Sequence, residues 1–324
     1  MTEPLLDVRH LRVEFPTRRG TLLALDDISL TISAGEILGV VGESGAGKSL
    51  TGAAIIGLLD PPGRIAAGEI RLAGRRIDNL PYEQMRRVRG REIGAVFQDP
   101  LTSLNPLYTV GQQLVETITT HLDLSAAQAR RRAVELLAST GIPAPEARVD
   151  HYPHQFSGGM RQRVVIALAL AAEPKLIVAD EPTTALDVSI QAQIIALLKK
   201  VCREQGAAVM LVTHDMGVIA EACDRVAVMY AGRVAEIGPV ADVIHRPAHP
   251  YTAGLMGAIP AMDADRERLL QIDGAMPRLT AMPPGCAFHP RCGRATDRCH
   301  VDRPELAAVG QTQAACWHAV TEEA

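Results

Sequence analysis

Apolar positions along the chain follow two different periods, and together they predict an α/β protein. Residues 5–33 alternate apolar and polar side chains, which favours half-buried antiparallel strands. The runs at 37–41 and 176–179 are continuously apolar and are typical of fully buried strands. Residues 111–139, which lie between the two apolar runs, have the spacing of two amphipathic helices. Ser125 is the expected N-cap of the second helix. We therefore expect a buried sheet, an antiparallel section and a helical insertion.

Further segments complete this outline. Strands are expected at 69–72, 93–98 and 208–213, a helix at 188–204 that ends at Gly206, and a hairpin at 225–238. The loop at 99–106 carries two prolines, so we expect no regular structure there. Residues 245–324 are proline-rich, which predicts an irregular C-terminal extension held by cross-links rather than by a core.

The stretch from Gly42 to Ser49 reads G-x-x-x-x-G-K-S and lies between an apolar strand and a helical pattern. This spacing, in this context, predicts a phosphate-binding loop. Glycines allow successive backbone N–H groups to point inward, and the positive end of the following helix faces the same place. The residues expected to bind nucleotide here are Gly42, Ser44, Gly45, Gly47, Lys48 and Ser49, with Lys48 on the β- and γ-phosphates and Ser49 on Mg²⁺.

A second helix N-terminus is suited to an anion. Ser157 is a good N-cap, and Gly158 and Gly159 leave the first N–H groups of the helix accessible. One nucleotide in one chain needs only one such end. This surplus suggests that the second end faces a nucleotide held by another subunit.

Polar residues at the ends of the predicted strands supply candidate chemistry. Asp180 is placed to complete the Mg²⁺ shell, and Glu181 to polarise an attacking water. Gln98 could accept a hydrogen bond from a metal-bound water, and His214 could contact a γ-phosphate. Phe15 either stacks on adenine or is an ordinary core aromatic. The adjacent carboxylates favour hydrolysis over simple binding.

Four of the six cysteines lie in the last forty residues, at Cys286, Cys292, Cys299 and Cys316. In a reducing compartment such a set favours metal ligation over disulfides. Four thiolates suit zinc or a [4Fe–4S] cluster. The absence of C-x₂₋₄-C pairs, together with the resemblance described below, favours iron–sulfur, and free thiols are a third possibility. If zinc is the ion, a nearby histidine could replace a cysteine; the candidates are His289, His300 and His318. We expect a role in folding or docking and none in hydrolysis.

Composition excludes several other classes of protein. The chain has 324 residues, 47% of them hydrophobic, which is enough for a large packed domain. A net charge of −4 gives no indication of nucleic-acid binding. No secretory signal is apparent, and the longest apolar run, 164–172, is shorter than the ~20 residues that span a bilayer. We therefore expect a cytoplasmic protein whose membrane role would require other chains.

Taken in order, these motifs resemble those of the nucleotide-binding domain of an ABC transporter. The matching segments are 42–49 (Walker A), Gln98 (Q-loop), 157–159 (signature), Asp180-Glu181 (Walker B with the catalytic glutamate), Leu186-Asp187 (D-loop) and His214 (switch histidine). Phe156 and Met160 depart from the commoner signature, but the phosphate-facing positions are kept. The resemblance implies a P-loop NTPase fold with a RecA-like core, an antiparallel β-subdomain, a helical subdomain at about 100–165 and a small Cys-rich C-terminal extension.

More narrowly, the segment 98–106, the Phe-Ser-Gly-Gly-Met signature and the extension with His249-Pro250-Tyr251 resemble ATP-binding subunits of dipeptide/oligopeptide importers. This implies an ATPase domain at 1–244, an extension at 245–324, and ATP and Mg²⁺ as cofactors. The implied partners are a related ATPase subunit in a heterodimer, two permeases and an extracytoplasmic peptide-binding protein, with no nucleic acid. The implied location is the cytoplasmic face of the plasma membrane.

Other functions fit the sequence less well. Nickel and glutathione importers remain alternatives within the transport class, because the substrate contacts other chains. A soluble ABC ATPase of ribosomes or DNA repair usually has two cassettes, long coiled coils or zinc modules, and this chain has none of these. A P-loop kinase would leave His214 and residues 157–159 unexplained.

Overall fold

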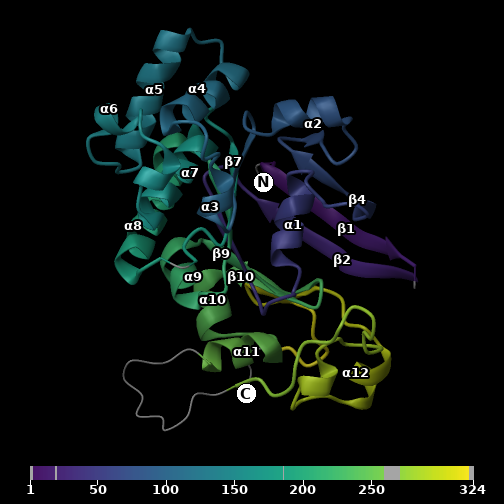
Figure 1. Ribbon diagram of the computed structural model, residues 1–324. Helices are drawn as coiled ribbons and strands as arrows, with labels where there is room; N and C mark the ends of the chain where they lie inside the picture. Colours follow the sequence, from purple (N-terminus) through teal and green to yellow (C-terminus); the bar gives the residue numbers. More distant parts are fainter. Residues whose placement is uncertain (1–2, 19, 185, 259–270, 321–324) are drawn as a thin grey trace. The chain divides into compact units, whose positions relative to one another are not determined.

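The computed structural model describes residues 3–18, 20–184, 186–258 and 271–320, and they fall into two compact units (Figure 1). The first unit contains residues 3–5, 32–37 and 79–211, and the second contains 6–31, 38–78 and the residues from 212 onward. Each unit therefore combines segments that are distant in the sequence.

The first unit has a buried sheet at its centre. Its strands are β6 (Ile93–Val96), β7 (Leu176–Asp180) and β8 (Ala208–Val212), in the order β8-β7-β6. β6 and β7 run parallel, with Ile93 opposite Leu176. The apolar run 176–179 is fully buried, as its composition predicts.

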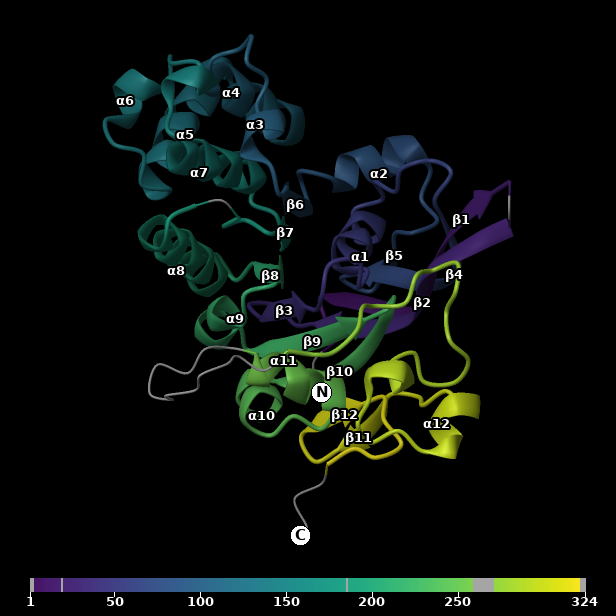
Figure 2. The ribbon, with the colours of Figure 1, turned by 60° about the horizontal axis from the view of Figure 1, so that its bottom comes forward.

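Helices form the rest of this unit, and in both views α4, α5 and α7 lie together (Figures 1 and 2). The helices are α2 (Tyr82–Val88), α3 (Pro100–Ser103), α4 (Val110–His121), α5 (Ala126–Ser139), α6 (Pro145–Arg148), α7 (Gly158–Leu170) and α8 (Val188–Gln205), with a 3-10 turn at Pro153–Gln155. The two helices expected at 111–139 are confirmed, and Ser125 caps the second by accepting from the Gln128 N–H. Gly206 ends α8 in the left-handed conformation, as expected.

The prediction of no regular structure at 99–106 is wrong. Pro100 begins the short helix α3, where a missing N–H has no consequence because the first residues of a helix have no intrahelical partner for it. The hydroxyl groups of Thr102 and Ser103 donate to the Asp99 carbonyl oxygen, which stabilises the turn. Proline therefore marks a helix start here.

The second unit contains an antiparallel sheet formed by the N-terminal strands. Its order is β2 (Gly20–Ile32), β1 (Leu6–Thr17), β4 (Arg64–Leu72) and β5 (Arg75–Arg76). β1 and β4 are antiparallel, with Leu6 opposite Leu72 and Val8 opposite Ile70. All four of these side chains are buried, so the alternation at 5–33 correctly predicts half-buried strands.

A second sheet of this unit joins the phosphate loop to the C-terminal extension. Its order is β11 (Ala307–Val309), β12 (Thr312–Ala314), β10 (Arg233–Pro239), β9 (Arg225–Tyr230) and β3 (Ile37–Val41). β9 is parallel to β3 and antiparallel to β10, and Figure 2 shows β11 and β12 beside β10. The helices of this unit are α1 (Lys48–Ile55), α9 (Met216–Ala222), α10 (Val240–His245), α11 (Pro250–Gly257) and α12 (Asp297–Val301), with a 3-10 turn at His289–Arg291.

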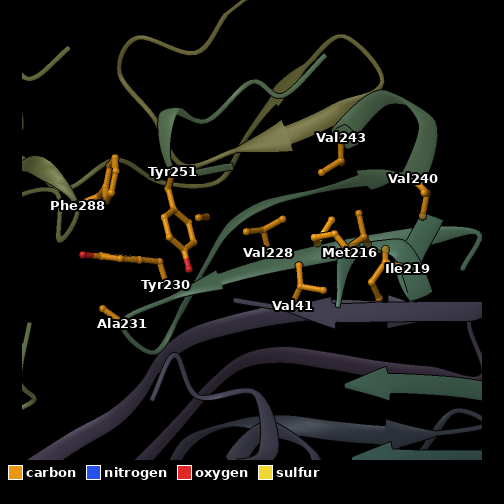
Figure 3. Close-up of a cluster of buried hydrophobic side chains, with 12 residues drawn as sticks. Val41, Met216, Ile219, Val228, Tyr230, Ala231, Val240, Val243, Tyr251 and Phe288 are labelled. Carbon is orange, nitrogen blue, oxygen red and sulfur yellow. The ribbon is translucent and has the colours of Figure 1, made fainter. Parts of the chain in front are cut away.

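The C-terminal extension contributes to the hydrophobic core of the second unit. Tyr251 is fully buried and Phe288 nearly so, and both pack with Tyr230 of β9 in one apolar cluster (Figure 3). The ring centroids of Tyr230 and Tyr251 lie 4.6 Å apart, and those of Tyr251 and Phe288 lie 5.4 Å apart. The expectation of an extension without a core is therefore wrong, because aromatic side chains from separate parts of it insert against β9.

His249 links this core to the start of α11. It is buried, and its Nδ1 accepts the Tyr251 N–H at 3.0 Å, which caps the helix. Burial lowers the pKa of His249 from 6.5 to about 4, although a hydrogen bond to the Ala315 backbone opposes the shift. The neutral ring is thus a part of the folded structure, since a protonated Nδ1 could not accept.

We predict that stability falls as the pH drops from 6.5 towards 4. In this range the unfolded chain takes up a proton at His249 and the folded chain does not, so the lost stabilisation is on the order of 2–3 kcal/mol at pH 4. His249→Asn keeps an acceptor for the cap and removes the titration. Urea unfolding across this pH range should give a steeper decline for the wild type than for the variant; parallel curves would contradict the prediction.

Candidate functional site

The phosphate loop, residues 42–49, connects β3 to α1. Gly42, Gly45 and Gly47 all have positive φ, at 148°, 81° and 103°, which other residues rarely adopt. A Cβ at position 42 would overlap the Met229 carbonyl oxygen of β9. The loop therefore depends on glycine both for its conformation and for its close approach to β9.

The lysine of the loop lies over the loop's own backbone. Lys48 is buried, and its Nζ donates to the carbonyl oxygens of Gly42 at 2.8 Å and Glu43 at 3.1 Å. α1 begins at this residue after Gly47, and in the described chain no side chain caps this end. The result is a helix N-terminus with an ammonium group beside it, an arrangement that suits a phosphate.

His214 lies beside the start of the phosphate loop, in the second unit. A cavity of about 380 Å³ is lined by His214 together with Gly42 and Glu43 of the phosphate loop. The Thr213 N–H donates to the Val40 carbonyl oxygen of β3 at 3.1 Å, which holds the chain before His214 beside the strand that leads into the loop. His214 is thus a neighbour of the start of the phosphate loop, as its strand-end position suggests.

Phe15 is half-buried in β1. Its ring lies against Gly63, where a Cβ would come within 2.6 Å of the ring carbon Cε1. This contact packs the ring carbons Cε1 and Cζ against Gly63. Both expectations for Phe15, adenine stacking and core packing, stay predictions.

Asp180 and Glu181 lie at the carboxyl end of β7 in the first unit. Glu181 has φ of 47°, in the left-handed region, which is uncommon for a residue with a Cβ. Its Oε2 accepts two hydrogen bonds, from Gln98 Nε2 at 3.0 Å and from the Thr184 hydroxyl at 2.7 Å. The carboxylate is therefore held in a fixed orientation at the edge of the sheet.

The two hydrogen bonds to the Glu181 carboxylate are not evident in the sequence. Gln98, proposed above as an acceptor from a metal-bound water, here donates to Glu181, across 83 residues of sequence. Thr184 was not among the candidates, yet it orients the same carboxylate. Its position three residues after Glu181, in a turn where its N–H donates to the Glu181 carbonyl oxygen, is the only local signal.

The signature segment forms the start of α7. Ser157 is the N-cap and accepts from the Met160 N–H at 3.4 Å, as predicted. A Cβ at Gly158 would meet nothing within 4 Å among the described residues, whereas one at Gly159 would contact Ile190 of α8. Packing against Ile190 thus explains why residue 159 is glycine. No contact among the described residues explains why residue 158 is glycine.

The C-terminal extension reaches the phosphate loop, which the sequence gives no reason to expect. The Arg291 guanidinium binds the Glu43 carboxylate, and the Tyr251 hydroxyl accepts the Glu43 N–H at 2.9 Å. The separations in sequence are 248 and 208 residues. Neither residue belongs to a nucleotide-binding motif.

The four cysteines of the extension line one small cavity, of about 10 Å³, together with His289 and His318. All four are free thiols, and burial raises the pKa of the Cys286 and Cys316 thiols. Among the described residues, however, no group of three or more His, Cys, Asp or Glu side chains is arranged as a metal site. The structure thus gathers the thiols without closing them around a common point.

The predicted site residues therefore form two groups, each within one unit. The second unit holds the phosphate loop, Phe15 and His214, and the first holds Gln98, the signature segment, Asp180 and Glu181. That the two groups meet around one Mg-ATP stays a prediction. No bilayer-spanning helix occurs in the described part of the chain.

Comparison with known families and structures agrees with this geometry. The ABC transporter family model matches residues 25–184, and the model for the oligopeptide/dipeptide transporter C-terminal region matches residues 235–299. The oligopeptide transport ATP-binding protein OppD of Salmonella typhimurium is 47% identical over 318 residues, covering 98% of this chain and 95% of OppD. The chain belongs to the ABC transporter ATP-binding proteins. Within this family it lies in the oligopeptide/dipeptide branch.

Two further relatives support the ABC ATPase assignment. The dipeptide transport ATP-binding protein DppD of Escherichia coli is 47% identical over 302 residues, covering 93% of this chain and 92% of DppD. A post-hydrolysis dimer of the ATP-binding cassette MJ0796 with ADP and phosphate matches with a TM-score of 0.66 and 31% identity, covering 72% of this chain and 98% of the cassette. ABC transporter ATP-binding proteins are ATPases coupled to transport, and the ABC nucleotide-binding fold expected from the motifs is confirmed.

Proposed function

We propose that this chain hydrolyses ATP to drive the import of di- or oligopeptides through separate membrane subunits. The hydrolytic part rests on Glu181, whose carboxylate follows Asp180 at the end of a buried strand and is oriented by Gln98 and Thr184. The peptide part rests on the relatives, which are named oligopeptide and dipeptide transport proteins. Nickel or glutathione import remains the alternative within this class.

In this proposal the phosphate loop binds the triphosphate of ATP. Lys48 exchanges its bonds to the loop carbonyls for bonds to the β- and γ-phosphates, and Ser49 ligates Mg²⁺. Asp180 and Gln98 complete the Mg²⁺ environment, and Glu181 accepts the proton of the attacking water. His214 contacts the γ-phosphate, which its place in the cavity beside Gly42 supports. Phe15 is the proposed stacking partner of the adenine, with core packing as the alternative.

We further propose that Ser157, Gly158 and Gly159 serve the nucleotide bound by a partner ATPase. The open space around the Cβ position of Gly158 supports this role, because nothing in the described chain requires glycine there. The similar cassette is itself a dimer with ADP and phosphate. The proposed partner is a related subunit, which would form a heterodimer with this chain at the cytoplasmic face of the membrane. The other proposed partners are two permeases and an extracytoplasmic peptide-binding protein. We place the ATPase domain at 1–244 and the extension at 245–324.

For the cysteines we propose a metal centre held by Cys286, Cys292, Cys299 and Cys316. Their gathering around one cavity supports it, although the present arrangement is not a ready site. The wide sequence spacing favours a [4Fe–4S] cluster. Zinc is the alternative, since a cavity of about 10 Å³ has room for a single ion.

The first prediction from the proposed function concerns Glu181→Gln. Removing a positioned base typically lowers the rate by ~10²–10⁴, while the phosphate loop is unchanged. The variant should bind ATP normally, hydrolyse it very slowly and accumulate as a closed dimer. Phosphate release and size-exclusion chromatography with Mg-ATP measure both effects, and near-normal turnover would rule out the assignment.

The second prediction separates the two nucleotide sites of the dimer. Lys48→Ala should prevent photolabelling of this chain by an azido-ATP probe, whereas Gly158→Asp should leave it intact and reduce turnover at the partner's site. The carboxylate introduced by Gly158→Asp would repel the phosphates of the nucleotide at the partner's site, which is why turnover there should fall. Loss of labelling of this chain in Gly158→Asp would show that the signature segment acts within its own subunit.

The third prediction concerns the cysteines. After anaerobic purification, about four irons per chain and a broad brown absorbance support the cluster. One zinc and a colourless protein identify zinc, and no metal under these conditions overturns the metal centre altogether.

A further inference from the structure

Glu43 introduces a negative charge into a loop that has to bind a polyanion. It is the second residue of the phosphate loop, directly after Gly42. Its carboxylate oxygens accept from both terminal nitrogens of Arg291, Oε2 from Nη1 at 2.8 Å and Oε1 from Nη2 at 2.9 Å. The Arg291 side chain is only 6% exposed and that of Glu43 28%, so solvent screens the pair weakly.

Arg291 is itself fixed by the C-terminal extension. Its Nε donates to the Asp273 carbonyl oxygen at 2.8 Å and its Nη2 to that of Ile272 at 3.2 Å. The guanidinium also lies within 6.0 Å of the Tyr230 and Phe288 ring centroids. These contacts orient the guanidinium as a planar fork that matches a carboxylate in two-point geometry.

The backbone of Glu43 is held as well. Its N–H donates to the buried Tyr251 hydroxyl at 2.9 Å, and its carbonyl oxygen accepts from Lys48 Nζ at 3.1 Å. Residue 43 thus connects the extension, through Arg291 and Tyr251, to the lysine that is expected to bind phosphate. A change in the orientation of residue 43 would move the carbonyl groups that now hold Lys48.

We propose that Arg291 is a positioning residue for ATP binding, which neutralises the Glu43 carboxylate and fixes its orientation beside the phosphate loop. Without this partner, the carboxylate would stand unpaired beside the bound phosphates and repel them. This inference rests on the proposed ATPase function. It assigns to the extension a direct part in forming the nucleotide site, in addition to any metal centre.

The decisive variant is Arg291→Ala in the full-length chain. The dissociation constant of a fluorescent ATP analogue and the KM for ATP should both rise about tenfold, with kcat changed less than twofold, because the Glu181 chemistry is untouched. Arg291→Lys keeps the charge and loses the two-point geometry, so it should fall between the wild type and Arg291→Ala. The matched control is Arg278→Ala, an exposed arginine of the same extension, which should bind as the wild type does.

A second-site substitution distinguishes charge pairing from general damage to the fold. Glu43→Gln removes the charge of the carboxylate. The double variant Arg291→Ala with Glu43→Gln should therefore recover most of the ATP affinity that Arg291→Ala alone loses. Thermal unfolding of each variant is measured in parallel. If Arg291→Ala unfolds and loses all binding, Arg291→Lys decides in its place: weaker ATP binding that an added Glu43→Gln restores supports the role, and unchanged binding rejects it.

The outcomes separate this inference from the proposed function. A wild-type chain that fails to bind ATP would refute the ATPase function. A wild type that binds ATP, together with an Arg291→Ala variant that is folded and equally tight, would refute the positioning role alone. A lower affinity that Glu43→Gln does not restore would also refute it, because the loss would then not come from the unpaired carboxylate.

Discussion

A triphosphate can be held only where backbone N–H groups and cations converge and where no unpaired negative charge competes. The remainder of the second unit is arranged around this electrostatic requirement. Gly42 and Gly47 allow the loop to adopt positive φ values beside β9, and α1 directs its N-terminus towards the same point. The Glu43 carboxylate, which violates the requirement, is paired with an arginine that other groups hold in place. The aromatic packing of Tyr251 and Phe288 is therefore part of the same arrangement.

A comparable restraint operates in the first unit, at the carboxylate of Glu181. Glu181 occupies a backbone conformation that disfavours side chains, and hydrogen bonds from Gln98 and Thr184 hold its carboxylate. Gln98 comes from the end of a neighbouring parallel strand, so sheet register and not local sequence brings the pair together. The two units thus restrain two different carboxylates, one by neutralising it and the other by orienting it.

Much of the fold could be predicted from the sequence, because the relevant signals are local. Alternation at 5–33, the apolar run at 176–179 and the cap at Ser125 each depend on neighbouring residues and are confirmed. The helix at Pro100 was missed, since proline is equally compatible with a loop and with a first helical turn. The contacts of Glu43 could not be predicted, because a glutamate in a variable position of the motif says nothing about an arginine 248 residues away. The core of the extension was missed for a similar reason, as its aromatic residues are isolated in the sequence and only meet on β9.

The long separation between Glu43 and its partners also has a consequence for biosynthesis. The ribosome synthesises the phosphate loop well before the segments that supply Tyr251 and Arg291, which follow Glu43 by 208 and 248 residues. Until then the nascent chain carries its glycine-rich loop with an unneutralised carboxylate. With the proposed role of Arg291, nucleotide affinity would mature only after these segments have docked, so that shorter fragments would be weak competitors for cellular ATP.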